Sequence, residues 1–132
     1  MNHVNLLAAA MGVLAVTGSA GFAGECTNAS LSGHYTYWMQ GTDADGKPFG
    51  EVGQEHYDGN GNIEAVFADA GEAAVEKATG TYTINEDCSG TAVYSSGQTY
   101  HFFVAPGGDS FVVASADAGI VAVGENTRVG TR

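Results

Sequence analysis

The chain has 132 residues, which is the length of one domain rather than two. Its 15 acidic and 4 basic residues give a formal net charge of −11, which disfavours nucleic acid and anionic membranes as partners because both are polyanions. Hydrophobic residues make up 44% of the chain and only 2 residues are proline, which argues against global disorder and against a collagen-like or proline-rich chain.

The N-terminus has the pattern of a signal peptide. Residues 6–16 form an uninterrupted apolar run, shorter than the ~20 residues that span a bilayer. Gly21 and Ala23 fit the small positions before a cleavage site, so we predict that 1–23 is removed and that 24–132 is the mature domain. No Lys or Arg precedes the run, although signal peptides usually carry positive charge there. The alternative to a signal peptide is a buried N-terminal helix. Export predicts a secreted or periplasmic protein with no membrane span in the mature chain.

Cys26 and Cys88 both lie in the predicted mature domain. In an exported protein such a pair predicts a disulfide, which would close a long loop and stabilise the fold by roughly 4 kcal/mol. The alternative is two free thiols. Neither cysteine belongs to a CxxC motif or a Cys/His cluster, so we do not expect this pair to bind a metal.

The mature chain is predicted to form short strands separated by turn residues. An aromatic-rich strand is predicted at 34–40, followed by turn chemistry at 42–48 and a second strand at 49–57. The segment 58–62 contains Asp-Gly and Asn-Gly, which supply the positive φ of a tight hairpin turn, and 63–69 is predicted to pair back.

Residues 72–79 are ambiguous because their composition favours a helix, whereas eight residues between two glycines make a marginal one. We predict a strand there. The remaining predicted strands are 81–85, 91–95, 98–105, 111–116 and 120–128. Eight or nine short strands with short loops predict an all-β fold, a single eight-stranded antiparallel up-and-down barrel with room for side chains or one small ligand.

Both faces of the strands at 34–40 and 98–105 are partly apolar. A monomeric barrel with a wet exterior should alternate more cleanly between apolar and polar residues. This pattern predicts that the N-terminal segment covers part of the exterior or that the barrel forms a homo-oligomer.

Four segments carry a family resemblance, namely 31–35, 48–49, 57–62 and, most specifically, 80–91 (GTYTINEDCSGT). Together they resemble small exported bacterial proteins with barrels of the allene oxide cyclase or calycin (lipocalin-like) type. The resemblance implies a barrel that holds a lipophilic small molecule, and a few related barrels catalyse cyclisations in the cavity. The lipocalin Gly-x-Trp signature is absent because Gly33 and Trp38 lie five residues apart, and no cyclase catalytic residue can be matched.

Glu51, Glu55 and Tyr57 are the candidate catalytic residues, and they share one strand face with Phe49 and Gly53. If that face points inward, a buried carboxylate there has a raised pKa and can act as a general acid or base. The alternative, which we favour on the sequence, is that the face points outward and both glutamates are solvated.

The other polar motifs favour structural roles. His34, His56 and His101 show no metal-ligand spacing, and the Asp-rich segments at 43–46 and 58–62 resemble turns more than calcium loops. We therefore expect no metal and no cofactor. The chain contains no GxSxG motif for a serine hydrolase.

The sequence favours an exported barrel that binds a small apolar or amphipathic molecule rather than an enzyme. The residues expected to contact the ligand are aromatic: Tyr37, Trp38, Tyr82, Tyr100 and Phe102. The alternatives are an isomerase or cyclase in which Glu55 or Glu51 moves a proton, and a structural protein that assembles through an apolar exterior.

Overall fold

The structure is a computed structural model that describes residues 25–131. The predicted signal peptide, residues 1–23, and its cleavage site lie outside the described residues. Within 25–131, no helix is both long enough and apolar enough to cross a membrane.

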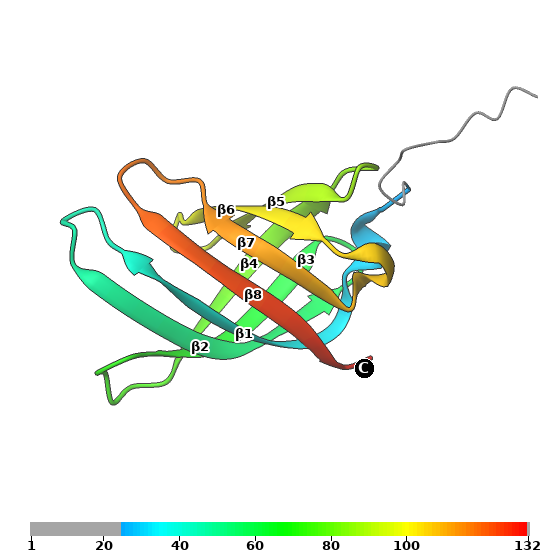
Figure 1. Cartoon of the computed structure of the whole chain (residues 1–132). Coiled ribbons are helices and arrows are strands. Elements are labelled where there is room, and N and C mark those ends of the chain that lie inside the picture. The colour runs from blue at the N-terminus through cyan, green and yellow to red at the C-terminus, as the bar shows by residue number, and fades with distance from the viewer. Residues whose placement is uncertain (1–24, 132) are drawn as a thin grey trace, which may run out of the picture.

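Eight antiparallel strands form one closed barrel in which each strand pairs with the next and β8 pairs with β1 (Figure 1). This confirms the predicted all-β, up-and-down, eight-stranded barrel. The strands are β1 (Ser32–Thr42), β2 (Pro48–Asp58), β3 (Asn62–Asp69), β4 (Glu76–Ile84), β5 (Ser89–Tyr94), β6 (Thr99–Val104), β7 (Ser110–Ser115) and β8 (Val121–Gly130).

The hairpin between β2 and β3 has the predicted turn chemistry. Oδ1 of Asp58 accepts hydrogen bonds from the backbone N–H groups of Asn60 and Asn62, at 2.7 and 3.0 Å. Gly59 and Gly61 have φ values of 77° and 102°, which a side chain would strain. The Asp58 carboxylate therefore acts here as a local turn former.

The ambiguous segment 72–79 contributes the start of a strand. Residues 76–79 belong to β4, which continues through Gly80 to Ile84, so the two short strands predicted at 72–79 and 81–85 are one. A Cβ on Gly80 would lie 2.9 Å from the Val93 carbonyl oxygen. Gly80 thus permits β4 and β5 to approach closely instead of ending the strand.

One half of the barrel interior is filled by aromatic side chains. Tyr57 is fully buried and makes edge-to-face contacts with Tyr35, Tyr82 and Phe111, with ring centroids 5.2–5.4 Å apart. Leu31 is also fully buried in this cluster. This packing forms the main core of the domain.

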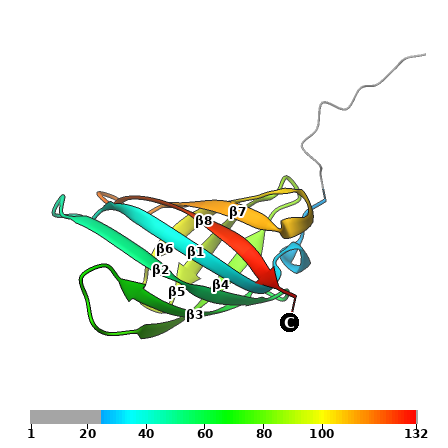
Figure 2. The same cartoon turned by 60° about the horizontal axis from the view of Figure 1, so that its bottom comes forward.

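The same end is closed by two short 3₁₀ helices, η1 (Asn28–Ser30) and η2 (Pro106–Gly108) (Figure 2). The Tyr82 hydroxyl donates hydrogen bonds to the carbonyls of Asn28 and Leu31, at 2.9 and 2.8 Å. The Tyr35 hydroxyl donates to the Gly108 carbonyl at 2.6 Å. Core tyrosines therefore hold both helices against the barrel.

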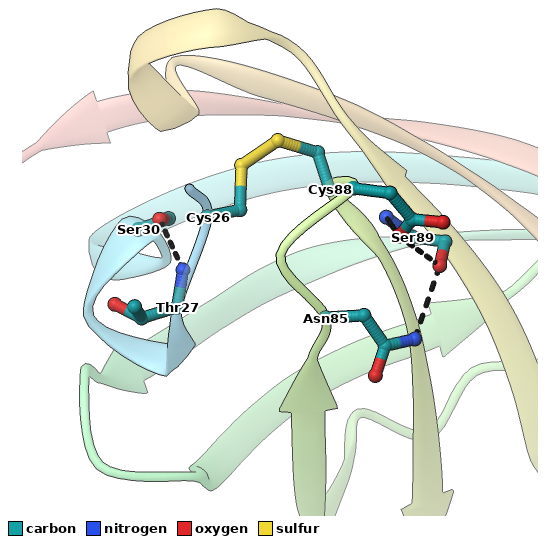
Figure 3. The surroundings of a disulfide bond; sticks show 7 residues. Cys26, Thr27, Ser30, Asn85, Cys88 and Ser89 are labelled. Atoms are coloured by element: carbon teal, nitrogen blue, oxygen red, sulfur yellow. Dashed lines mark hydrogen bonds between the residues drawn. A yellow bond between two sulfur atoms is a disulfide. The ribbon is translucent and has the colours of Figure 1, made fainter. Parts of the chain in front are cut away.

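The predicted disulfide between Cys26 and Cys88 is present (Figure 3). It joins the segment before η1 to the turn between β4 and β5, with a Cα–Cα distance of 5.0 Å across 62 residues. The bond fixes the N-terminal segment over the closed end.

Candidate functional site

The opposite end of the barrel opens into a cavity of about 740 Å³. Residues from the β1–β2, β3–β4, β5–β6 and β7–β8 loops surround its mouth. Because consecutive strands are antiparallel, every second loop lies at the same end of the barrel, and these four loops share one end (Figure 1). The filled aromatic half forms its floor. The site is thus a cup with a single rim of loops.

The cavity walls combine apolar and aromatic side chains from most of the strands. They include Tyr37, Met39, Phe49, Phe67, Tyr94, Tyr100, Phe102, Val113 and Ile120. Tyr94 and Tyr100 pack edge to face, with ring centroids 5.7 Å apart. Walls of this kind suit the apolar part of a small molecule.

Glu55 lies in the floor of the cavity and is only 5% exposed. Its carboxylate accepts hydrogen bonds from Tyr57 Oη and Asn126 Nδ2, each at 2.7 Å, and from the Tyr94 hydroxyl. These partners come from β2, β8 and β5. The face of β2 that carries the glutamates therefore points inward, and the sequence-based preference for an outward, solvated face was wrong.

Two opposing effects act on the Glu55 carboxyl. Burial raises its pKa because it penalises the charged form, and the hydrogen bonds from Tyr94, Tyr57 and Asn126 oppose that rise. The net direction is upward from the ordinary value of 4.5. Glu55 therefore takes up and releases its proton at a higher pH than a solvated carboxyl group does.

Glu51 stands nearer the mouth on the same face of β2. The Tyr37 hydroxyl donates a hydrogen bond to its Oε1 at 2.5 Å. Burial raises the pKa of Glu51, as does Asp69, its partner in the β2–β3 register, while the Tyr37 hydrogen bond lowers it. The same surroundings raise the pKa of Tyr37, chiefly through burial, so this phenol stays protonated as a donor.

The cavity has a strongly acidic lining, with seven acidic residues and two lysines, Lys47 and Lys77. Among residues 25–131 the one ion pair joins Arg128 to Asp109 at the closed end. No cation in the described part of the chain therefore pairs with Glu51 or Glu55.

The structure places only three of the five predicted ligand contacts in the cavity wall, Tyr37, Tyr100 and Phe102. Tyr82 belongs to the packed closed end, where its hydroxyl binds backbone carbonyls. Trp38 points outward and is 44% exposed, because it alternates with the buried Tyr37 along β1. Tyr57, a candidate catalytic residue, lies beneath Glu55 and is a hydrogen-bond donor to it.

Sequence reasoning missed Tyr94 and Asn126, two of the three donors to Glu55. The signal for Asn126 was its spacing of two residues from Gly124 and four from Ala122, which places a polar amide on an inner face of small residues. Tyr94 shares a face with Gly90 and Ala92 of β5 by the same spacing.

The predicted absence of a metal centre remains a prediction, but no candidate ligand set forms in the described range. Residues 25–131 contain no group of three or more His, Cys, Asp or Glu side chains arranged to hold a metal ion. His34 and His56 instead pair with each other across β1 and β2, with ring centroids 4.6 Å apart. His101 is exposed on β6.

Comparison with known proteins assigns the chain to no family. No family model and no curated protein matches the chain. A solved structure of a de novo designed, fluorescence-activating β-barrel is similar at 17% identity and a TM-score of 0.49, covering 76% of this chain and 94% of that one. The likeness to allene oxide cyclase and calycin barrels therefore stays a resemblance.

Proposed function

We propose that this protein binds one small amphipathic molecule inside its barrel. The observation that carries the proposal is the division of the interior into a packed half and an open cavity of about 740 Å³ with aromatic walls. A barrel of this size can be filled by side chains alone. Leaving half of the interior open costs packing energy that a stability role does not explain.

The arrangement of the walls supports a ligand with one polar end. The apolar part would lie against Tyr100, Phe67 and Phe102, while the polar end would reach toward Glu55 at the floor. A polar group at a fixed position among aromatic side chains orients a bound ligand.

We further propose that the protein works in an oxidising compartment outside the cytoplasm, as a secreted or periplasmic barrel of the calycin-like class. The Cys26–Cys88 disulfide supports this, because such bonds persist where thiols are not kept reduced. The intact mass of the exported protein tests it. A mass that corresponds to residues 24–132 with two fewer hydrogens is expected, and retention of residues 1–23 would contradict export with cleavage.

The binding proposal is tested with Nile red, an uncharged dye that becomes fluorescent in apolar surroundings. Val113 points into the cavity and its neighbour Val112 points outward on the same strand, so V113F and V112F form a matched pair. We expect V113F to reduce dye uptake strongly and V112F to leave it unchanged, with melting curves showing that both variants are folded. Equal uptake by the two variants would contradict binding in the cavity.

A second candidate function is proton transfer to or from a bound substrate, as in an isomerase or cyclase. The inward position of Glu55 and its raised pKa favour this candidate. The two functions differ in the fate of the ligand. Mass spectrometry of the molecules extracted from the wild type and from E55Q distinguishes them. A binding protein would yield the same compound from both, whereas an enzyme would yield product from the wild type and substrate from E55Q.

A further inference from the structure

We propose that the molecule bound in this cavity is an organic cation, an amine with an apolar body whose ammonium group is held by Glu55. The inference rests on the proposed binding function and specifies the class of ligand. It follows from three features of the cavity: its charge, its aromatic walls and the spacing of its two inner carboxylates.

The charge of the cavity is the first feature. Seven acidic residues and two lysines line it. Both lysines and five of the acidic residues lie at the rim, in or next to the loops, so the inner charged groups are Glu51 and Glu55. Glu55 is nearly inaccessible from outside and receives only neutral donors, from Tyr57, Tyr94 and Asn126. A buried carboxylate without a counter-ion attracts a cation more strongly than a solvated one does.

The aromatic walls are the second feature. Tyr37, Tyr94 and Tyr100 line the space above Glu55, and their ring faces offer negative charge density to a cation. Burial raises the pKa of Tyr100 to about 12, with Glu51 adding to the rise, so this phenol carries no negative charge of its own at neutral pH. An ammonium group beside Glu55 would thus meet a carboxylate and aromatic rings together.

The third feature is the spacing of Glu51 and Glu55. Both lie on the inner face of β2, and the residue between them on that face is Gly53, over which the Tyr37 ring packs. Four residues of strand separate their Cα atoms by about 13 Å. Glu51 would therefore meet the ligand near the mouth and Glu55 would hold its ammonium at the floor.

Binding of a cation should be coupled to proton release. The polar and titratable groups that surround Glu55 come from five strands: Tyr37 of β1, Glu51 and Tyr57 of β2, Tyr94 of β5, Tyr100 of β6 and Asn126 of β8. Burial raises the pKa of Glu55 most, and the hydrogen bonds from Tyr94, Tyr57 and Asn126 oppose it. An ammonium group favours the carboxylate over the carboxylic acid. A cation should therefore bind more tightly as pH rises through the Glu55 pKa, whereas an uncharged ligand should not.

The test uses three molecules with one indole body and different charges. Tryptamine is a cation, tryptophol is neutral and indole-3-propionate is an anion, and each is titrated against Nile red bound to the wild-type protein. We expect tryptamine to displace the dye at a concentration at least about tenfold lower than tryptophol, as a charge-assisted hydrogen bond provides. Indole-3-propionate should be the weakest of the three.

Two variants assign the preference to the cavity. E55Q should remove most of the difference between tryptamine and tryptophol, whereas E64Q makes the same charge change on the outer face of β3 and should keep it. If E55Q does not fold, two other measurements take its place. The first is the preference of E51Q for tryptamine over tryptophol. The second is the proton release that accompanies tryptamine binding to the wild type, measured by calorimetry in buffers of different ionisation enthalpy. The proposal would be overturned if tryptamine bound without proton release and E51Q preferred tryptamine over tryptophol as strongly as the wild type does.

The outcomes separate the ligand class from the binding function. If Nile red enters the wild-type cavity and tryptophol competes as well as tryptamine, the cation proposal is wrong and the binding function stands. If V113F takes up Nile red as well as the wild type does, the binding function itself is wrong. A preference for tryptamine that E55Q loses and E64Q keeps supports both.

Discussion

The Tyr94 hydroxyl donates a hydrogen bond to Oε1 of Glu55, although 39 residues separate the two in sequence. The strands that carry them, β5 and β2, are not neighbours in the barrel, so the bond crosses its interior. Together with the bond from Asn126 of β8, it fixes a carboxylate at the boundary between the packed half and the open cavity. The barrel thus places a buried acidic group on the floor of a cavity, which is unusual for a side chain with a purely structural role.

Stability should fall as pH rises above the ordinary carboxyl pKa. The folded-state pKa of Glu55 is raised, so the folded protein holds this proton longer than the unfolded chain does. The favourable contribution is complete below about pH 4.5 and is lost as pH rises through the folded-state pKa. Each pH unit between the unfolded-state and folded-state pKa values corresponds to about 1.4 kcal/mol of unfolding free energy. Melting curves of E55Q between pH 4 and 9 should show a flatter decline than those of the wild type.

Y94F sharpens this prediction. The Tyr94 hydrogen bond is the largest effect that opposes the raised pKa of Glu55, so its removal should raise that pKa further. The decline should then extend to higher pH and become larger in total. A shallower decline in Y94F, or a decline in E55Q as steep as in the wild type, would show that another group controls it.

Loss of the disulfide should destabilise the fold and spare the cavity. The Cys26–Cys88 bond lies at the closed end, whereas the cavity opens at the other. Replacement of both cysteines by serine should lower the free energy of unfolding by up to roughly 4 kcal/mol, measured by denaturant titration. At temperatures where the variant is folded, its affinity for Nile red should match that of the wild type. Wild-type protein with its disulfide chemically reduced serves as the control. A weaker affinity of the serine variant for Nile red would show that the two ends of the barrel are coupled.

Trp38 should report on the exterior and not on the ligand. It is the chain's only tryptophan and points outward, where its register partners are Val52 of β2 and Glu125 of β8. Acrylamide should quench its fluorescence efficiently, equally with and without a ligand in the cavity. W38F should leave Nile red affinity unchanged, in contrast to V113F. Protection of Trp38 that depends on protein concentration would instead reveal the predicted homo-oligomer.

The architecture was predictable because its signals are local. The Asp-Gly and Asn-Gly turn predicted at 58–62 depends only on neighbouring residues, and it forms the hairpin between β2 and β3. The adjacent residues Tyr37 and Trp38 cannot both face inward on a regular strand, so predicting both as ligand contacts overlooked the alternation itself.

The candidate site was harder to predict because long-range partners decide it. On 49–57 the inner face carries Glu51 and Glu55 beside two aromatic residues, and the outer face carries Val52 beside polar residues, so hydropathy alone does not decide which side is buried. The inward direction depends on Tyr94 and Asn126, whose positions beside Glu55 follow from the closure of the barrel. A carboxylate on an inner face is the kind of local conflict expected at a functional site.

Gly53 should be required for the close packing of Tyr37, a residue of the cavity wall, against β2. A Cβ at this position would lie 2.5 Å from the Val66 carbonyl oxygen and 2.7 Å from Cε1 of Tyr37, which are closer than real contacts allow. G53A should therefore displace Tyr37, weaken its hydrogen bond to Glu51 and cost about 1–3 kcal/mol of stability through overpacking. The matched control is G50A on the same strand, where the nearest atom is the Ala70 Cβ at 3.7 Å. Denaturant titration should show this loss of stability in G53A and not in G50A, and Nile red binding should weaken in G53A because Tyr37 lines the cavity. Equal stability of the two variants would show that the wall can relax around the added methyl group.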